Sequence, residues 1–127
     1  MKTKPELIAR FDLDEGGAPR FLESGESDRR HYNITLHTKA PSGTESVLYT
    51  LDPTYFDPVR EVQRSERPDF AEEITSYGDY EIQIATSGSS HNLPNREWLS
   101  DALRRGHASE LTSNPAILGA IEDIERS

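Results

Sequence analysis

The chain has 127 residues, of which 23 are Asp or Glu and 14 are Lys or Arg, so its net charge is −9. This acidity argues against electrostatic binding to nucleic acid or to an anionic membrane, because both carry charge of the same sign. The charge serves solubility alone, or it attracts a basic partner such as a peptide that bears lysine or arginine. The absence of cysteine excludes disulfides and thiolate chemistry.

The length fits a single domain with its own core. Only 33% of the residues are hydrophobic and the mean hydropathy is −0.76, so we expect a compact core under a very polar surface. The first residues contain no apolar run that resembles a signal peptide, and no segment approaches the roughly 18 to 20 apolar residues that cross a bilayer. We therefore expect a soluble cytoplasmic protein.

Apolar and polar residues alternate through the first two thirds of the chain, which is the pattern of half-buried strands. The clearest example is Tyr80, Ile82 and Ile84, which alternate with charged or polar neighbours. The expected strands span residues 6–13, 31–36, 45–51, 59–64, 69–75 and 79–84. Segments 14–30 and 86–95 are rich in Gly, Ser and charge and read as loops. Short strands joined by turns favour a mainly β, antiparallel β-sandwich.

The last third of the chain changes to a helical period. Asn95 is the expected N-cap of a helix over 96–105, in which Trp98 anchors an apolar stripe on the sandwich and which Gly106 ends. Asn114 and Pro115 begin a second helix, whose stripe is Ile117, Ile121 and Ile124. The chain thus divides into a sandwich over 1–90 and a helical extension over 91–127, which packs on the sandwich or on a partner.

Strand direction predicts where the loops meet. If successive strands run antiparallel, the loops after 6–13, after 45–51 and after 69–75 lie at one end of the sandwich. These loops carry Phe21, Tyr55 with Phe56, and Tyr77. Aromatic loops on a rigid scaffold are typical of a binding surface.

Three segments, in this order and spacing, resemble a YEATS domain, most closely the prokaryotic branch of that family. They are His31-Tyr32-Asn33-Ile34-Thr35-Leu36, then Val47-Leu48-Tyr49-Thr50-Leu51-Asp52-Pro53-Thr54-Tyr55 with Asp57-Pro58-Val59-Arg60, and then Ser76-Tyr77-Gly78-Asp79-Tyr80-Glu81-Ile82. The resemblance covers about residues 31–86. It implies an immunoglobulin-like antiparallel β-sandwich, to which the helical period of the last third adds two C-terminal helices. It also implies a non-enzymatic module that reads acylated lysine on a peptide without a cofactor.

The resemblance also implies a site. Tyr55 takes the place of the family's loop Phe, and Tyr77 that of the aromatic ring facing it, so that a flat acyl amide lies between them. Thr54 takes the place of the hydroxyl donor, and the N–H of Gly78 lies beside the second ring. The alternatives from the residues alone are that both tyrosines cap the end of the sandwich, that Thr54 stabilises its turn, and that Phe56 packs under its own loop.

The chain also departs from the family pattern. Asp52 stands where the family has His, and a carboxylate only accepts hydrogen bonds. Asp52 therefore favours a positively charged group such as unmodified lysine, or it binds the N–H groups of its own loop as an Asx-type turn. Ser76 replaces a Gly, and Phe21 and His31 are the candidates for a third aromatic residue.

No constellation of nucleophile, base and orienting group is visible, so we do not expect an enzyme. His31, His37, His91 and His107 lack the spacing of metal ligands. The acidic run Asp69, Glu72, Glu73, Asp79 and Glu81 is a solvated face or a guide for a basic partner. A second hypothesis is a scaffold or adaptor in a bacterial conflict or signalling assembly, which oligomerises or docks through its C-terminal helices.

Overall fold

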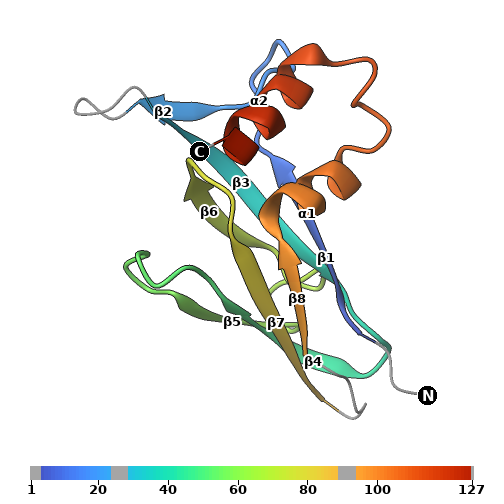
Figure 1. The fold of residues 1–127 in the computed structure, drawn as a ribbon. Helices are drawn as coiled ribbons and strands as arrows, with labels where there is room; N and C mark the ends of the chain where they lie inside the picture. Colours follow the sequence, from blue (N-terminus) through green and yellow to red (C-terminus); the bar gives the residue numbers. More distant parts are fainter. Residues whose placement is uncertain (1–3, 24–28, 89–93, 127) are drawn as a thin grey trace.

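The computed structural model describes residues 4–23, 29–88 and 94–126, which form two antiparallel four-stranded sheets and two α-helices (Figure 1). The elements in chain order are β1 (Glu6–Phe11), β2 (Phe21–Glu23), β3 (Arg30–Lys39), β4 (Thr44–Thr50), β5 (Val59–Gln63), β6 (Glu72–Ser76), β7 (Glu81–Gly88), β8 (Asn95–Trp98), α1 (Leu99–Gly106) and α2 (Pro115–Arg126). This confirms the predicted mainly β, immunoglobulin-like sandwich with two C-terminal helices.

The first sheet is built around the long strand β3. Tyr32 pairs with both Phe21 and Ser76, and Ile34 pairs with both Phe11 and Ile74. Strands β1 and β2 therefore lie end to end on one side of β3, and β6 lies on the other side. The second sheet has the order β5-β4-β7-β8.

The alternation found in the sequence sets which side chains enter the core. On β3, Tyr32, Ile34 and Leu36 are buried while the residues between them are partly exposed. They face inward residues of the second sheet, among which Tyr49 is fully buried. The Tyr49 hydroxyl donates to the Phe70 carbonyl at 2.7 Å and lies 2.7 Å from the Thr38 hydroxyl, so its polar atom is satisfied.

Two short strands lie where none was expected. The first is β2, which falls within the predicted loop 14–30. The predicted strand β7 is also longer than expected and extends to Gly88, into the predicted loop 86–95. Residues 89–93 of that loop lie outside the described residues. The second unexpected strand is β8, which occupies the predicted start of the first helix because Asn95–Trp98 pairs with β7. Both added strands are too short for periodicity to reveal, since pairing with a long neighbour forms them.

The first helix therefore begins three residues later than predicted. Asn95 is not its N-cap: the Asn95 side chain donates to the Pro5 carbonyl at 2.8 Å. Asp79 holds the helix start instead, accepting from the backbone N–H of Ser100 at 2.9 Å and from its hydroxyl at 2.6 Å. The prediction that Trp98 anchors the helix on the sandwich is wrong, because alternation along β8 leaves Trp98 outside and 47% exposed.

The second helix begins where the sequence predicted. The Asn114 side chain accepts from the N–H groups of Ala116 and Ile117 at 3.2 and 3.3 Å, which is the role of an N-cap. Ile117, Ile121 and Ile124 are 0% exposed and belong to the common core of the chain. The isoleucine stripe is therefore covered by this chain itself and is not a surface for assembly.

The C-terminal segment closes the free edge of β1. The Leu7 N–H donates to Glu97 Oε2 at 2.6 Å, and the Leu7 carbonyl accepts from Arg105 at 3.0 and 3.1 Å. A Cβ at Gly106 would overlap the carbonyl oxygen of Ala9, so only glycine allows this approach. Neither helix of the described residues has the length and hydrophobicity to cross a membrane.

Candidate ligand-binding site

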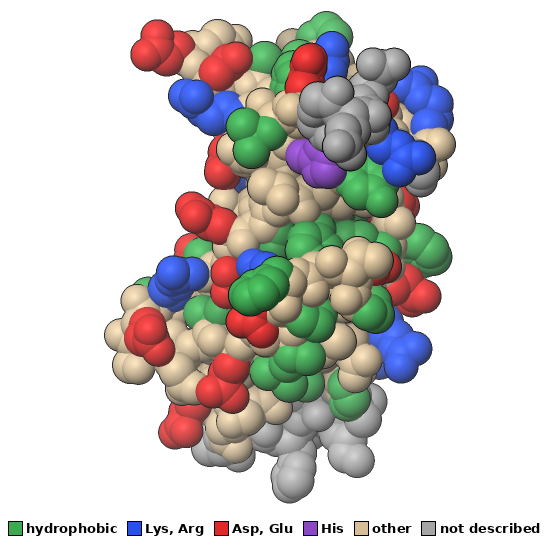
Figure 2. All heavy atoms as spheres, turned by 90° about the vertical axis from the view of Figure 1, so that its left-hand side faces the viewer, with side chains coloured by type: hydrophobic (Ala, Val, Ile, Leu, Met, Phe, Trp, Pro, Cys, Tyr) green, Lys and Arg blue, Asp and Glu red, His purple; other side chains and the backbone are tan. Residues whose placement is uncertain are grey.

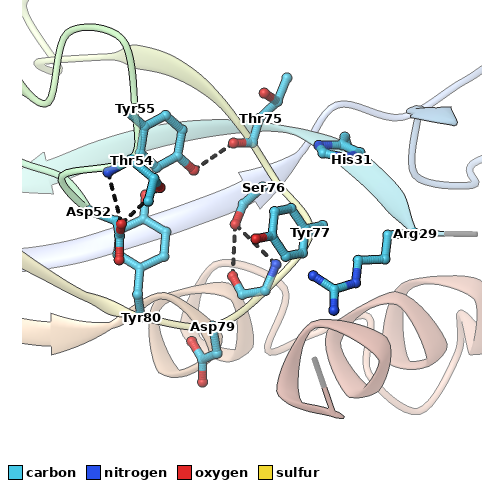
Figure 3. A pocket seen from close by; sticks show the side chains of 11 residues that line it. Arg29, His31, Asp52, Thr54, Tyr55, Thr75, Ser76, Tyr77, Asp79 and Tyr80 are labelled. Atoms are coloured by element: carbon cyan, nitrogen blue, oxygen red, sulfur yellow. Dashed lines mark hydrogen bonds between the residues drawn. The ribbon is translucent and has the colours of Figure 1, made fainter. Parts of the chain in front are cut away.

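A cavity of about 460 Å³ lies where the β4–β5 loop meets the β6–β7 loop (Figure 3). Its volume is in the range of small-ligand pockets. The lining includes Tyr55 from the first loop and Tyr77 and Tyr80 from the second, together with Arg29, which precedes β3, and His31 near the start of β3. The predicted site residues Asp52, Thr54 and Gly78 line it as well, so the structure brings all five predicted residues to one cavity.

The start of the β4–β5 loop is fixed by Asp52. Its Oδ1 accepts from the N–H of Thr54 at 3.0 Å and from the Thr54 hydroxyl at 2.8 Å. The backbone bond, followed by the hydroxyl bond, holds the pKa of the Asp52 carboxyl below its usual range. The Asx-type turn is thus confirmed. Because the Thr54 hydroxyl donates its hydrogen bond to Asp52, it is not a donor directed at the cavity.

Tyr55 is held from two sides. Its hydroxyl donates to the carbonyl of Thr75 at 2.5 Å, and its ring lies 5.7 Å from the ring of Tyr80 at an angle of 51°. Next to it, Arg60 donates to the carbonyl of Glu73 at 3.0 Å. Both side chains reach carbonyls on the outer edge of β6, so they tie the loop to the sheet and cover that edge.

Tyr77 is more open, with 42% of its surface exposed. The His31 ring meets it edge-on at 5.1 Å, and the Arg29 guanidinium lies 4.8 Å from its centroid. Arg29 forms no ion pair with a carboxylate of the described residues. The two predicted ring walls therefore border one cavity but have different neighbours. Of the candidates for a third aromatic residue, His31 lines the cavity, whereas Phe21 packs edge-on against Tyr32.

Ser76 stiffens the β6–β7 turn. Its hydroxyl donates to the Gly78 carbonyl at 2.7 Å, while the Gly78 N–H lies 3.4 Å from the same oxygen. At 3.4 Å that second contact is weak. The Gly78 N–H consequently keeps much of its capacity to donate to another acceptor.

Tyr80, like Arg29, is a site residue that the sequence did not reveal. Its hydroxyl is buried beside the hydroxyl of Tyr55 and makes no hydrogen bond of good geometry within the described residues. Burial, followed by the proximity of Tyr55, raises the pKa of this hydroxyl well above its usual value. The alternation of β7 presented Tyr80 as an ordinary core residue. The sequence signal that could have placed Tyr80 in the site is its position three residues after Tyr77, in the same turn. In a turn, strand alternation no longer determines which way a side chain points.

Phe56 does not pack under its own loop as predicted. It is fully exposed, at 103%, because Tyr55 takes the inward position of the loop and turns the next residue outward. Within the described residues, no group of three or more His, Asp or Glu side chains is arranged to hold a metal ion.

No family model matches the chain, and no curated protein matches it. Similar solved structures exist. The yeast AF-9 homologue Yaf9 has a TM-score of 0.46 and 19% identity, covering 75% of this chain and 67% of that one. The chain resembles YEATS domains. The Yaf9 YEATS domain recognising an H3K122suc peptide has a TM-score of 0.45 and 16% identity, over 77% of this chain and 75% of that chain. The Yaf9 YEATS domain bound to H3K27ac has 0.44 and 16%, over 77% and 74%.

Proposed function

We propose that this protein is a non-enzymatic binding module, and that it holds an acylated or unmodified lysine-like side chain of a peptide in the cavity between the β4–β5 and β6–β7 loops. The observation that carries the proposal is the meeting of Tyr55, Tyr77 and Tyr80 around one cavity of about 460 Å³. Figure 2 shows hydrophobic side chains gathered across the middle of the face toward which the β4–β5 loop extends, with acidic side chains beside them.

The rings suit a flat polar group. Tyr77 already carries a planar group, the Arg29 guanidinium, on its ring. An acyl amide is also planar and stacks in the same manner. Tyr80 supplies the buried hydroxyl that lacks a partner, so we assign to it, with the Gly78 N–H, the hydrogen bonds to the amide oxygen.

Charge favours an acylated lysine over an unmodified one. The carboxylates of Asp52 and Asp79 are engaged by Thr54 and by Ser100. The guanidinium of Arg29 stays over Tyr77 and repels a second cation at that ring. An acyl group that ends in a carboxylate gains an attraction to the same arginine.

The test is an NMR titration of the full chain with four peptides of one sequence, whose central lysine is unmodified, acetylated, crotonylated or succinylated. We expect shifts at Tyr55, Tyr77 and Gly78 with the acylated peptides and weaker ones with the unmodified peptide. Tyr77→Ala should abolish them. Phe21→Ala, which removes a ring of similar exposure outside the cavity, should not. Absence of shifts with all four peptides would contradict the proposal.

A further inference from the structure

A second cavity of about 360 Å³ borders the first. Tyr55 and Thr75 line both cavities. The rest of the second cavity is lined by Asp12, Asn33, Arg60, Glu73 and Ile74. Because the Tyr55 hydroxyl is fixed on the Thr75 carbonyl, its ring stands as a shared wall between the two spaces.

The register of the first sheet sets the spacing of the cavities. Asn33 and Thr75 are direct partners on β3 and β6, and their side chains face outward. His31 lies two residues before Asn33 on β3 and Tyr77 two residues after Thr75, so this second pair lies on the same outer face. The second cavity includes the first pair and the first cavity includes the second pair. Successive outward rows of a sheet lie about 6.6 Å apart, twice the rise per residue.

We propose that the ligand is an extended peptide that runs along the outer face of β6, with the lysine-like side chain in the first cavity and a basic side chain, two residues away, in the second. The proposal rests on the proposed function of the first cavity. In an extended chain, side chains at positions i and i+2 point the same way and are about 6.6 Å apart, which equals the spacing of the rows.

The polar groups of the second cavity define the chemistry of that second side chain. The Glu73 carboxylate has no ion-pair partner among the described residues, and Asp12 uses one oxygen to accept from the Thr35 hydroxyl at 2.8 Å. Arg60, the cation at this cavity, is already engaged: it donates to the carbonyls of Asp57 and Glu73 and lies 3.5 Å from the Glu72 carboxylate. The cavity therefore offers unpaired carboxylate oxygens to an arginine or lysine side chain.

The overall charge acts in the same direction. With a net charge of −9 the protein attracts a basic peptide before contact. Glu73 stands on the exposed side of β6, so its ion pair with the peptide is only partly desolvated and contributes modestly. Recognition of the basic residue is expected to sharpen the choice of sequence rather than to supply most of the affinity.

The experiment compares acyl-lysine peptides that differ only in the place of one arginine, at one or at two residues before or after the acyl-lysine, with alanine as reference. We expect arginine at two residues, on the side set by the direction of the peptide, to lower Kd about two- to fivefold, as for a partly exposed ion pair. Arginine at the adjacent position points away from the sheet and should give no gain.

Matched variants separate this inference from the proposed function. Glu73→Gln should remove the gain from arginine and keep the affinity for the alanine peptide. Glu45→Gln, an equal change of charge at an exposed residue at the opposite end of the sandwich, should keep the gain. A gain that ignores position, or that survives Glu73→Gln while Tyr77 still shifts, overturns the inference and leaves the proposed function standing. If neither the acyl-lysine peptides nor the unmodified peptide shifts Tyr77, both fall.

Discussion

The backbone N–H of Phe11 donates a hydrogen bond to Nε2 of His107, 2.9 Å away and 96 residues later in the chain. Since Nε2 accepts, the ring proton is on Nδ1, which lies 3.0 Å from Glu110 Oε1 and donates to it. The ring is 0% exposed and stacks on Phe11 at 5.6 Å. Burial lowers the pKa of His107, outweighing the opposite effect of its bond to Glu110.

This arrangement predicts loss of stability in mild acid. The unfolded chain takes up the histidine proton near pH 6.5, whereas the folded chain does so only at lower pH. The contribution of His107 is therefore complete above about pH 6.5 and is lost as pH falls toward the folded pKa. Urea unfolding at pH 7.5, 6.5 and 5.5 should show a falling free energy of unfolding. His107→Gln should flatten this dependence; equal slopes in the variant and the unchanged protein would refute the assignment.

The contact between Gly106 and Ala9 predicts opposite effects for two glycine substitutions. Gly106→Ala should lower the free energy of unfolding by about 1–3 kcal/mol, because the new methyl group overlaps the backbone of β1. Gly119→Ala lies in the exposed interior of α2 with open space around the new methyl group, and should raise it by about 0.5–1 kcal/mol. Chemical denaturation measures both. Equal effects would mean that α1 does not approach β1 this closely.

The hydrogen bonds of Asp79 to Ser100 predict that a residue of the β6–β7 loop stabilises the start of α1. Asp79→Ala should cost about 1–2 kcal/mol of stability, since it leaves the N–H of Ser100 and its hydroxyl without an acceptor. Ser100→Ala should cost less, and the double variant should cost less than the sum. Asp101→Ala, in the exposed first turn of α1, is the control with a smaller effect. Strict additivity in a thermal or urea unfolding cycle would argue against coupling.

Two tyrosine hydroxyls at the cavity predict different outcomes when removed. Tyr55→Phe loses the bond to Thr75 and should cost about 0.5–1.5 kcal/mol of stability. Tyr80→Phe removes a buried hydroxyl without a partner, so the free energy of unfolding should stay the same or rise. Affinity for acyl-lysine peptides should fall in Tyr80→Phe all the same. Unchanged affinity would remove Tyr80 from the set of ligand donors.

The sequence predicted the long strands because their burial alternates without interruption, as on β3 and β7. It missed β2 and β8, whose few residues become strands by pairing with those neighbours. Trp98 was placed wrongly for the same reason: in a helix it would point inward with Leu99, whereas in a strand it points away. Pairing over long sequence distances is not contained in local periodicity.

The site was predictable in its location and less so in its chemistry. Strand direction brought Tyr55 and Tyr77 to the same end, which is a matter of counting reversals. Which hydroxyl is free to bind a ligand depends on the distances between side chains, and these are determined by tertiary packing. Thr54 is committed to Asp52, and Tyr80 lies unpaired, although both are polar residues in similar turns.

The closure of the β1 edge by Glu97, Arg105 and His107 has a consequence for shortened chains. Without that segment the outer N–H and C=O groups of β1 would be free to pair with an identical strand of another molecule. A fragment that ends at residue 90 should therefore self-associate into intermolecular sheets, detectable by light scattering and thioflavin fluorescence, while the intact chain stays dispersed.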